Sequence, residues 1–200
     1  MDEKKLEILE RASQVYMRLG VKSVTMDDLA RELGISKKTI YRFFNDKDDL
    51  IKSIIEMKVG MDSAICINSQ KQSENSIDAL LEVSKLVLEH FNNVNPTVFH
   101  DLKKYHSSAW EVMEKHKWEF VRNMILSNIK RGKEEGIYRN ELDEEILSNL
   151  YVANIEAIMD TRIFPWPKFK LQDAHIQHLH LFLHGMVSQK GLEYLKQKIK

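Results

Sequence analysis

The chain has 200 residues, of which 43% are hydrophobic and 30% are charged. This composition excludes a disordered or collagen-like chain and favours a globular protein with its own core. Because 30 lysines and arginines balance 30 aspartates and glutamates, net charge over the whole chain does not indicate nucleic-acid binding. The only cysteine, Cys66, excludes a disulfide framework or cysteine zinc site within one chain, which agrees with a reducing compartment.

Localisation is predicted from the start of the chain and from hydropathy. The N-terminal stretch is charged and amphipathic, without the apolar region of a signal peptide. No apolar run approaches the roughly 20 residues that a membrane span needs. We therefore expect a cytoplasmic protein that does not enter a membrane.

The first part of the chain predicts four helices. Apolar residues recur at three- and four-residue steps over residues 2–19, and Gly20 ends that helix. Thr25 is typical of an N-cap for a second helix, Gly34 permits a sharp turn, and a third short helix runs to residue 44. A fourth helix is expected over residues 47–61.

The remainder of the chain also follows helical periodicity. Residues 67–76 are polar and predict a loop. The predicted helices that follow cover residues 77–92, 97–104, 107–135, 142–164 and 172–198, the last one broken near residues 185–191. Because no hairpin signal is present, the fold class expected is all-α.

The segment over residues 25–44 has the physical pattern of a helix-turn-helix. In its second helix Ile40 and one of the two following phenylalanines are expected to be buried, which directs a basic and polar face outward. Such a face suits a major groove, since Lys and Arg pair with phosphates or guanine edges. The candidate DNA-binding residues are Thr25, Ser36, Lys37, Lys38, Thr39, Tyr41, Arg42 and Lys47.

Over residues 8–55 the sequence resembles the TetR family of bacterial regulators. The resemblance lies in VTMDDLA at residues 24–30, GIS at 34–36, TIYRFF at 39–44 and NDKDDL at 45–50. It implies phosphate contacts by Tyr41 and Lys47, a phosphate-facing Thr25, and base or phosphate contacts by the outward residues of the third helix. The sequence departs from the usual family pattern at Lys38 and Phe43.

The resemblance also implies two domains. Residues 1–46 would form an N-terminal three-helix, helix-turn-helix DNA-binding domain, and residues 47–200 a helical effector-binding and dimerisation domain. A homodimer would form through helices 142–164 and 172–189 and would bind a palindromic double-stranded DNA operator, since a single short reading helix makes few contacts. The fourth helix would connect the two regions.

An apolar effector cavity is one interpretation of the aromatic residues and methionines beyond residue 90, and a helical core is the other. The candidate lining residues are Phe91, Phe99, Trp110, Met113, Trp118, Met124, Tyr151 and Met159. The cluster His175, His178, His180 and His184 has helical spacing but lacks a full metal-ligand set. We therefore expect packing, with a pH-sensitive interface as an alternative, and neither a metal nor a cofactor.

The function predicted is a dimeric repressor that a small apolar or amphipathic effector releases from its operator. The alternatives are an effector-independent helical DNA-binding or adaptor protein, and a transcriptional activator. An enzyme is not expected, since the sequence shows no nucleophile–base pairing and no glycine-rich phosphate loop.

Overall fold

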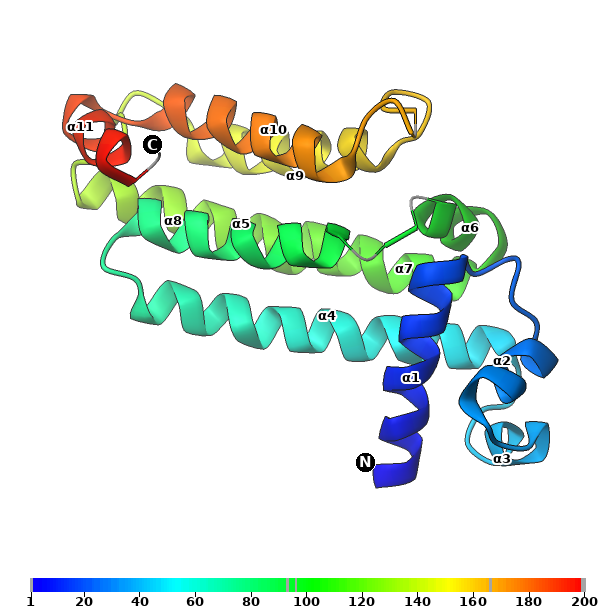
Figure 1. The fold of residues 1–200 in the computed structure, drawn as a ribbon. Coiled ribbons are helices and arrows are strands. Elements are labelled where there is room, and N and C mark those ends of the chain that lie inside the picture. The colour runs from blue at the N-terminus through cyan, green and yellow to red at the C-terminus, as the bar shows by residue number, and fades with distance from the viewer. Residues whose placement is uncertain (1, 93, 96, 166, 199–200) are drawn as a thin grey trace. The chain divides into compact units, whose positions relative to one another are not determined.

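The computed structural model describes residues 2–92, 94–95, 97–165 and 167–198, with side chains at all of these except positions 90 and 92. Within these residues the elements are helices (Figure 1), together with one isolated bridge between Tyr138 and Val187. The predicted all-α fold class is confirmed. No helix in the described part of the chain is long and apolar enough to cross a bilayer.

The chain divides into two compact units, and the first contains the described residues of 1–62 and 93–116. Its helices are α1 (Glu3–Leu19), α2 (Met26–Leu33), α3 (Lys37–Tyr41), the first part of α4 (Lys47–Gln72), α6 (Thr97–Tyr105) and α7 (Ser107–Lys115). Their apolar faces meet in one core, in which Ala12, Leu29, Ile40, Leu50 and Leu102 are completely buried.

Two polar contacts attach α6 and α7 to the rest of the first unit. The carboxylate of Asp101 on α6 accepts a hydrogen bond from the backbone N–H of Lys22, at 3.1 Å. The buried His106, which precedes α7, donates through Nδ1 to Asp48 at the start of α4, at 2.5 Å. The segment 97–106 is therefore fixed to both ends of the helix-turn-helix region.

The second unit contains the described residues of 63–92 and 117–200. It comprises the end of α4, α5 (Ser76–Asn92), most of the π-helical segment η1 (His116–Val121), α8 (Arg122–Glu134), α9 (Glu144–Met159), α10 (Leu171–Met186) and α11 (Gln189–Lys198). Figure 1 shows α9 and α10 running side by side, and α9 also packs on α8.

A close approach between Gly132 on α8 and Tyr138 organises one end of the second unit. A Cβ atom at position 132 would lie 2.1 Å from the ring of Tyr138, so only glycine fits there. The Tyr138 hydroxyl donates to Asn128, and the side-chain amide of Asn128 donates to the carbonyl of Ser76. The buried ring therefore connects α8 to the start of α5.

The predicted loop at residues 67–76 is wrong for most of its length, because α4 continues to Gln72. Its polar residues make hydrogen bonds while remaining helical: Gln70 donates to the carbonyl of Met124, and Arg131 donates to the carbonyls of Gln70 and Ser73. The polar residues of this segment contact α8, and a local sequence pattern does not reveal such long-range contacts.

The single helix predicted over residues 107–135 is interrupted by η1. Within it Lys117 is buried, and its ammonium donates to Glu156 on α9 at 2.8 Å. The helix predicted over 142–164 is shorter and runs from Glu144 to Met159, since the backbone becomes extended at Asp160. The predicted break near residues 185–191 is confirmed by the boundary between α10 and α11.

The compact units differ in extent from the functional domains predicted at 1–46 and 47–200. Residues 47–62 and 93–116 pack with the helix-turn-helix, and α4 contributes residues to both units. We propose residues 1–46 and 47–200 as the functional domains, with α4 connecting them.

Candidate nucleic-acid interface

The helix-turn-helix begins at a complete capping box on α2. The Thr25 hydroxyl oxygen accepts from the N–H of Asp28 at 3.1 Å, and the Asp28 carboxylate accepts from the N–H of Thr25 at 3.1 Å. The Thr25 hydroxyl also donates to that carboxylate, and these hydrogen bonds lower the pKa of Asp28. This arrangement satisfies orphan N–H groups and fixes where α2 starts.

The turn between α2 and α3 depends on one left-handed residue. Gly34 has φ +66° and ends α2, a conformation that glycine adopts at little cost. The N–H of Ile35 returns to the carbonyl of Ala30, and Ser36 caps α3 by accepting from the N–H of Thr39. The sequence GIS therefore fixes the angle at which α3 leaves α2.

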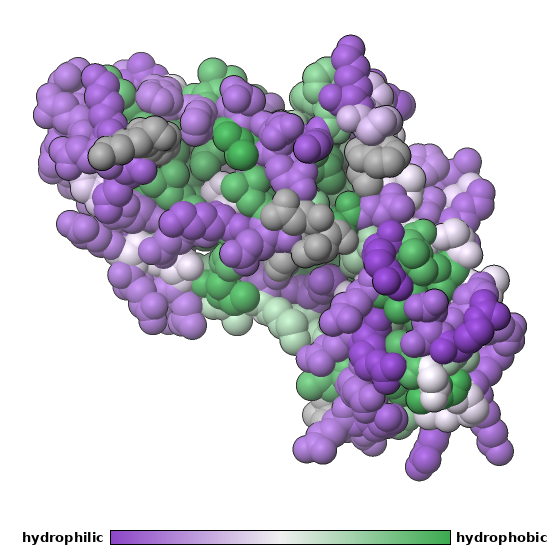
Figure 2. Space-filling view, in the orientation of Figure 1, coloured by the Kyte–Doolittle hydropathy of each residue, from purple (hydrophilic) through white to green (hydrophobic). Residues whose placement is uncertain are grey.

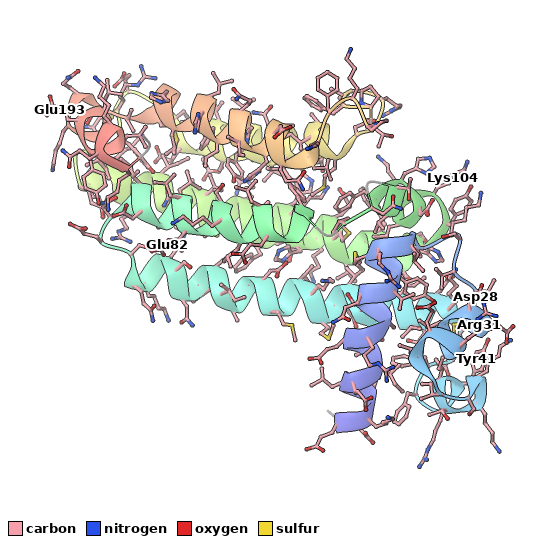
Figure 3. All side chains as sticks on the ribbon, in the orientation of Figure 1. Asp28, Arg31, Tyr41, Glu82, Lys104 and Glu193 are labelled. Carbon is pink, nitrogen blue, oxygen red and sulfur yellow. The ribbon has the colours of Figure 1, made fainter. Side chains whose placement is uncertain are left out.

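The α3 region has one buried face and one exposed face. Ile40 and Phe44 are almost completely buried in the core of the first unit, whereas Lys38, Tyr41 and Arg42 are exposed. Figure 3 shows Tyr41 on α3, with Asp28 and Arg31 on the neighbouring α2. We call Lys38, Tyr41 and Arg42 the exposed α3 set. Among the described residues, neither of its two cations, Lys38 and Arg42, forms an ion pair.

Besides Thr25, three further predicted DNA-binding residues have local partners. Lys37 donates to Asp27 at 3.0 Å, and its ammonium lies 6.0 Å from the centre of the Tyr41 ring. The hydroxyls of Ser36 and Thr39 are 2.8 Å apart and share a hydrogen bond. The bond to Asp27 uses one of the three N–H donors of the Lys37 ammonium, so donors remain for another acceptor.

Lys47 occupies a different environment from the exposed α3 set. Its ammonium donates to the carbonyls of Val21 and Val24, both at 2.7 Å, and lies over the ring of Tyr16. Burial lowers the pKa of Lys47. The structure thus uses Lys47 to hold the connection between α1 and α2, a role that the sequence pattern did not indicate.

Sequence reasoning also missed the contacts of Asp48, Asp101 and His106. Their partners lie 58 or 79 residues away along the chain, so no local spacing could have shown them. Arg11 was missed for the same reason: it donates to the carbonyl of Leu33 at the end of α2, at 2.6 Å.

The predicted effector residues are distributed over both units. Phe99, Trp110 and Met113 belong to the first unit, and Trp110 and Met113 pack against its core. The second unit contains Phe91, Trp118, Met124, Tyr151 and Met159. Among these, Phe91, Met124 and Tyr151 are buried, and Trp118 is exposed and donates to Glu156.

The four histidines of α10 have different environments. His175 and His178 are buried, His180 is half-buried and His184 is exposed. Burial lowers the pKa of both His175 and His178 to about 4. Within the part of the chain that the structure describes, no group of three or more His, Cys, Asp or Glu residues is placed to hold a metal ion.

Comparison with known proteins supports the sequence resemblance. A family model described as "Bacterial regulatory proteins, tetR family" matches residues 8–54. The HTH-type transcriptional regulator YhgD of Bacillus subtilis is 30% identical over 183 residues, covering 84% of this chain and 86% of that protein. A second regulator of that organism, YvaF, is 26% identical over 144 residues, covering 69% and 72%.

Solved structures show the same fold at lower identity. A transcriptional regulator from Saccharomonospora viridis in complex with choline has a TM-score of 0.77 and 18% identity, covering 94% of this chain and all of that one. The fatty acid degradation regulator FadR from Bacillus halodurans has a TM-score of 0.73 and 18% identity, covering 92% and 97%.

The fold and the capped helix-turn-helix define a DNA-binding transcriptional regulator. The chain belongs to the TetR family of bacterial regulatory proteins.

Proposed function

We propose that this regulator is a homodimeric repressor that binds a palindromic operator through α2 and α3. A small apolar or amphipathic effector would release it from that DNA. The observation that carries the proposal is the exposed α3 set, because two cations and a phenol are presented on a helix whose opposite face is buried. Such groups bind phosphates and base edges in the major groove.

The DNA contact is tested by fluorescence anisotropy on DNA from upstream of the protein's own gene. Arg42→Ala removes an exposed cation, and a dimer loses two such charges. If both contact phosphate, the salt dependence of binding should weaken by about two units of slope. Lys104→Ala is the matched control, because Lys104 is an exposed cation on α6, apart from Tyr41 on α3 (Figure 3). Equal losses for both variants would contradict the proposed contact.

Dimerisation is supported by apolar side chains that the second unit leaves exposed. Ile146 and Leu150 on α9 are 58% and 50% exposed, and Leu181 on α10 is 75% exposed. These two helices pack together in one chain, so the residues can form one face of a four-helix interface with a second copy. Other apolar residues of the same helices, such as Tyr151 and Leu183, are already buried in the core of their own chain.

The effector is supported by membership of the TetR family. The related fold from Saccharomonospora viridis is described in complex with choline, which favours a ligand-responsive regulator over an effector-independent adaptor. Mass spectrometry of small molecules that co-purify with the protein distinguishes the two. Repression and activation are distinguished by transcription from the operator in vitro, because the sign depends on where the operator lies.

Within the first unit, we propose that the contacts of Asp101 and His106 transmit the response to effector to the helix-turn-helix. They fix the segment 97–106 to the turn before α2 and to the start of α4, so a shift of that segment would move the helix-turn-helix. Asp101→Ala should therefore change DNA affinity although Asp101 is buried and lies outside the proposed DNA-contacting set. Unchanged affinity would exclude this route.

A regulator of this kind would act in the cytoplasm, where bacterial DNA lies, and would perform no catalysis. The regulators with which it shares sequence are consistent with a role outside catalysis.

A further inference from the structure

The second unit contains a buried histidine pair whose hydrogen bonding is incomplete. His175 is fully buried and His178 is 9% exposed. Among the described residues, Nδ1 of His175 and both ring nitrogens of His178 have no hydrogen-bond partner. Buried polar atoms are normally paired, and leaving one unpaired is costly. Three such atoms on adjacent turns of α10 are therefore not explained by packing alone.

The surroundings of the pair are aromatic and come from three helices. The Ser84 hydroxyl on α5 lies 3.1 Å from Nε2 of His175, and the Phe91 ring meets His175 edge-on at 5.8 Å. On the other side, His178 lies 5.0 Å from Tyr151 on α9, measured between ring centres, and Phe182 lies 5.8 Å from His178. The pair thus lies where α5, α9 and α10 meet, within one compact unit.

The charged groups around His175 and His178 determine which kind of ligand could bind there. Among the described residues, burial is the main cause that lowers the pKa of both histidines, and His178 lowers the pKa of His175 further. No carboxylate, lysine or arginine in the part of the chain that the structure describes contributes to these pKa shifts, so a charged ligand group would lack a counter-charge, which is unfavourable in a buried site. A neutral imidazole offers one donor and one acceptor, and a hydroxyl group can satisfy either.

We propose that Ser84, His175 and His178 form the polar end of the effector site and bind the hydroxyl group of an uncharged aromatic molecule. Tyr151, Phe91 and Phe182 would contact its apolar rings, since edge-on and offset ring contacts are favourable. The assignment rests on the proposed effector response. It narrows the proposed effector from a small apolar or amphipathic molecule to a neutral aromatic molecule that carries a hydroxyl group.

The test uses three probes of one shape on the full-length protein: 1-naphthol, naphthalene and 1-naphthoate. Isothermal titration calorimetry should show 1-naphthol binding at least tenfold more tightly than either of the others. His178→Phe keeps an aromatic ring and should weaken 1-naphthol at least tenfold while leaving naphthalene unchanged. His184→Phe is the matched control, because His184 is exposed on the same helix, and it should change neither affinity.

Three results would overturn the proposal: no binding of 1-naphthol, equal affinity for wild type and His178→Phe, or preference for 1-naphthoate. If His178→Phe does not fold, ¹⁵N-histidine NMR of the wild type gives the decision. The ¹⁵N resonances of the His178 ring must shift when 1-naphthol is added, and unchanged resonances would refute the contact.

DNA binding is measured on the same preparations, so the two proposals fail separately. Protein that binds its DNA but not 1-naphthol disproves this site and leaves the regulator intact. If the protein binds 1-naphthol but its DNA affinity does not change, the proposed binding site is supported and the proposed release of DNA by effector is refuted.

Discussion

Leu181 gives the most quantitative test of the proposed dimer. Its side chain is 75% exposed in the single chain, on a helix whose other apolar residues are mostly buried. Complete burial of a leucine contributes about 2 kcal/mol, so covering Leu181 contributes about 1.5 kcal/mol in each copy. In a symmetric interface both copies change together, and Leu181→Glu should cost at least about 3 kcal/mol, because the new carboxylate is also desolvated.

That cost corresponds to roughly a hundredfold rise in the dimer dissociation constant. Sedimentation equilibrium over a range of protein concentrations measures it directly. Ile67→Glu is the matched control, because Ile67 is an exposed apolar residue on α4, 43% accessible and outside the proposed interface. If both variants associate like the wild type, the face formed by α9 and α10 is not the dimer interface. Equal weakening by both variants would also refute the assignment.

Three further outcomes concern stability. Thr25→Val removes the hydroxyl of the α2 capping box and should lower the free energy of unfolding by about 1 kcal/mol in urea titrations; no loss would show that the cap is dispensable. Gly132→Ala places a Cβ against the Tyr138 ring and should cost at least about 2 kcal/mol by the same assay, whereas a stable variant would contradict the packing. His175 and His178 have a pKa of about 4 when folded, against 6.5 as the ordinary value, so the unfolded chain binds more protons between these values. Stability should fall as pH drops from 6.5 to 4, by up to about 3 kcal/mol for each histidine, and the double variant His175→Phe, His178→Phe should lose that slope; an unchanged slope would contradict their burial as neutral rings.

The helix-turn-helix could be predicted almost residue by residue because its determinants are local. The Thr25 cap, the left-handed Gly34 and the burial of Ile40 depend on neighbours within a few positions. The same holds for the break between α10 and α11. Helical periodicity was therefore sufficient to predict most of the helices.

Long-range contacts explain where the predictions were wrong or incomplete. The polar end of α4 is helical because Gln70 and Arg131 connect it to α8. The π-helical segment accompanies a buried lysine, Lys117, that pairs with Glu156 on another helix. Lys47 faces two carbonyls from the segment before α2. No spacing within one element reports such partners.

The histidines of α10 show the same limit at the candidate effector site. Their i, i+3 and i, i+4 spacing indicated shared helix faces but could not separate the buried pair, His175 and His178, from the exposed His184. Burial depends on α5 and α9, whose residues Ser84 and Tyr151 lie far away in the chain.

The central claim is that a dimer of this protein binds DNA through the exposed α3 set. Selection of bound duplexes from a random library tests it most directly, with the wild type beside a variant in which Lys38, Tyr41 and Arg42 are alanine. We expect the wild type to enrich a palindrome with two half-sites and the variant to enrich none. Enrichment of the same palindrome by both proteins, or of no sequence by the wild type, would contradict it.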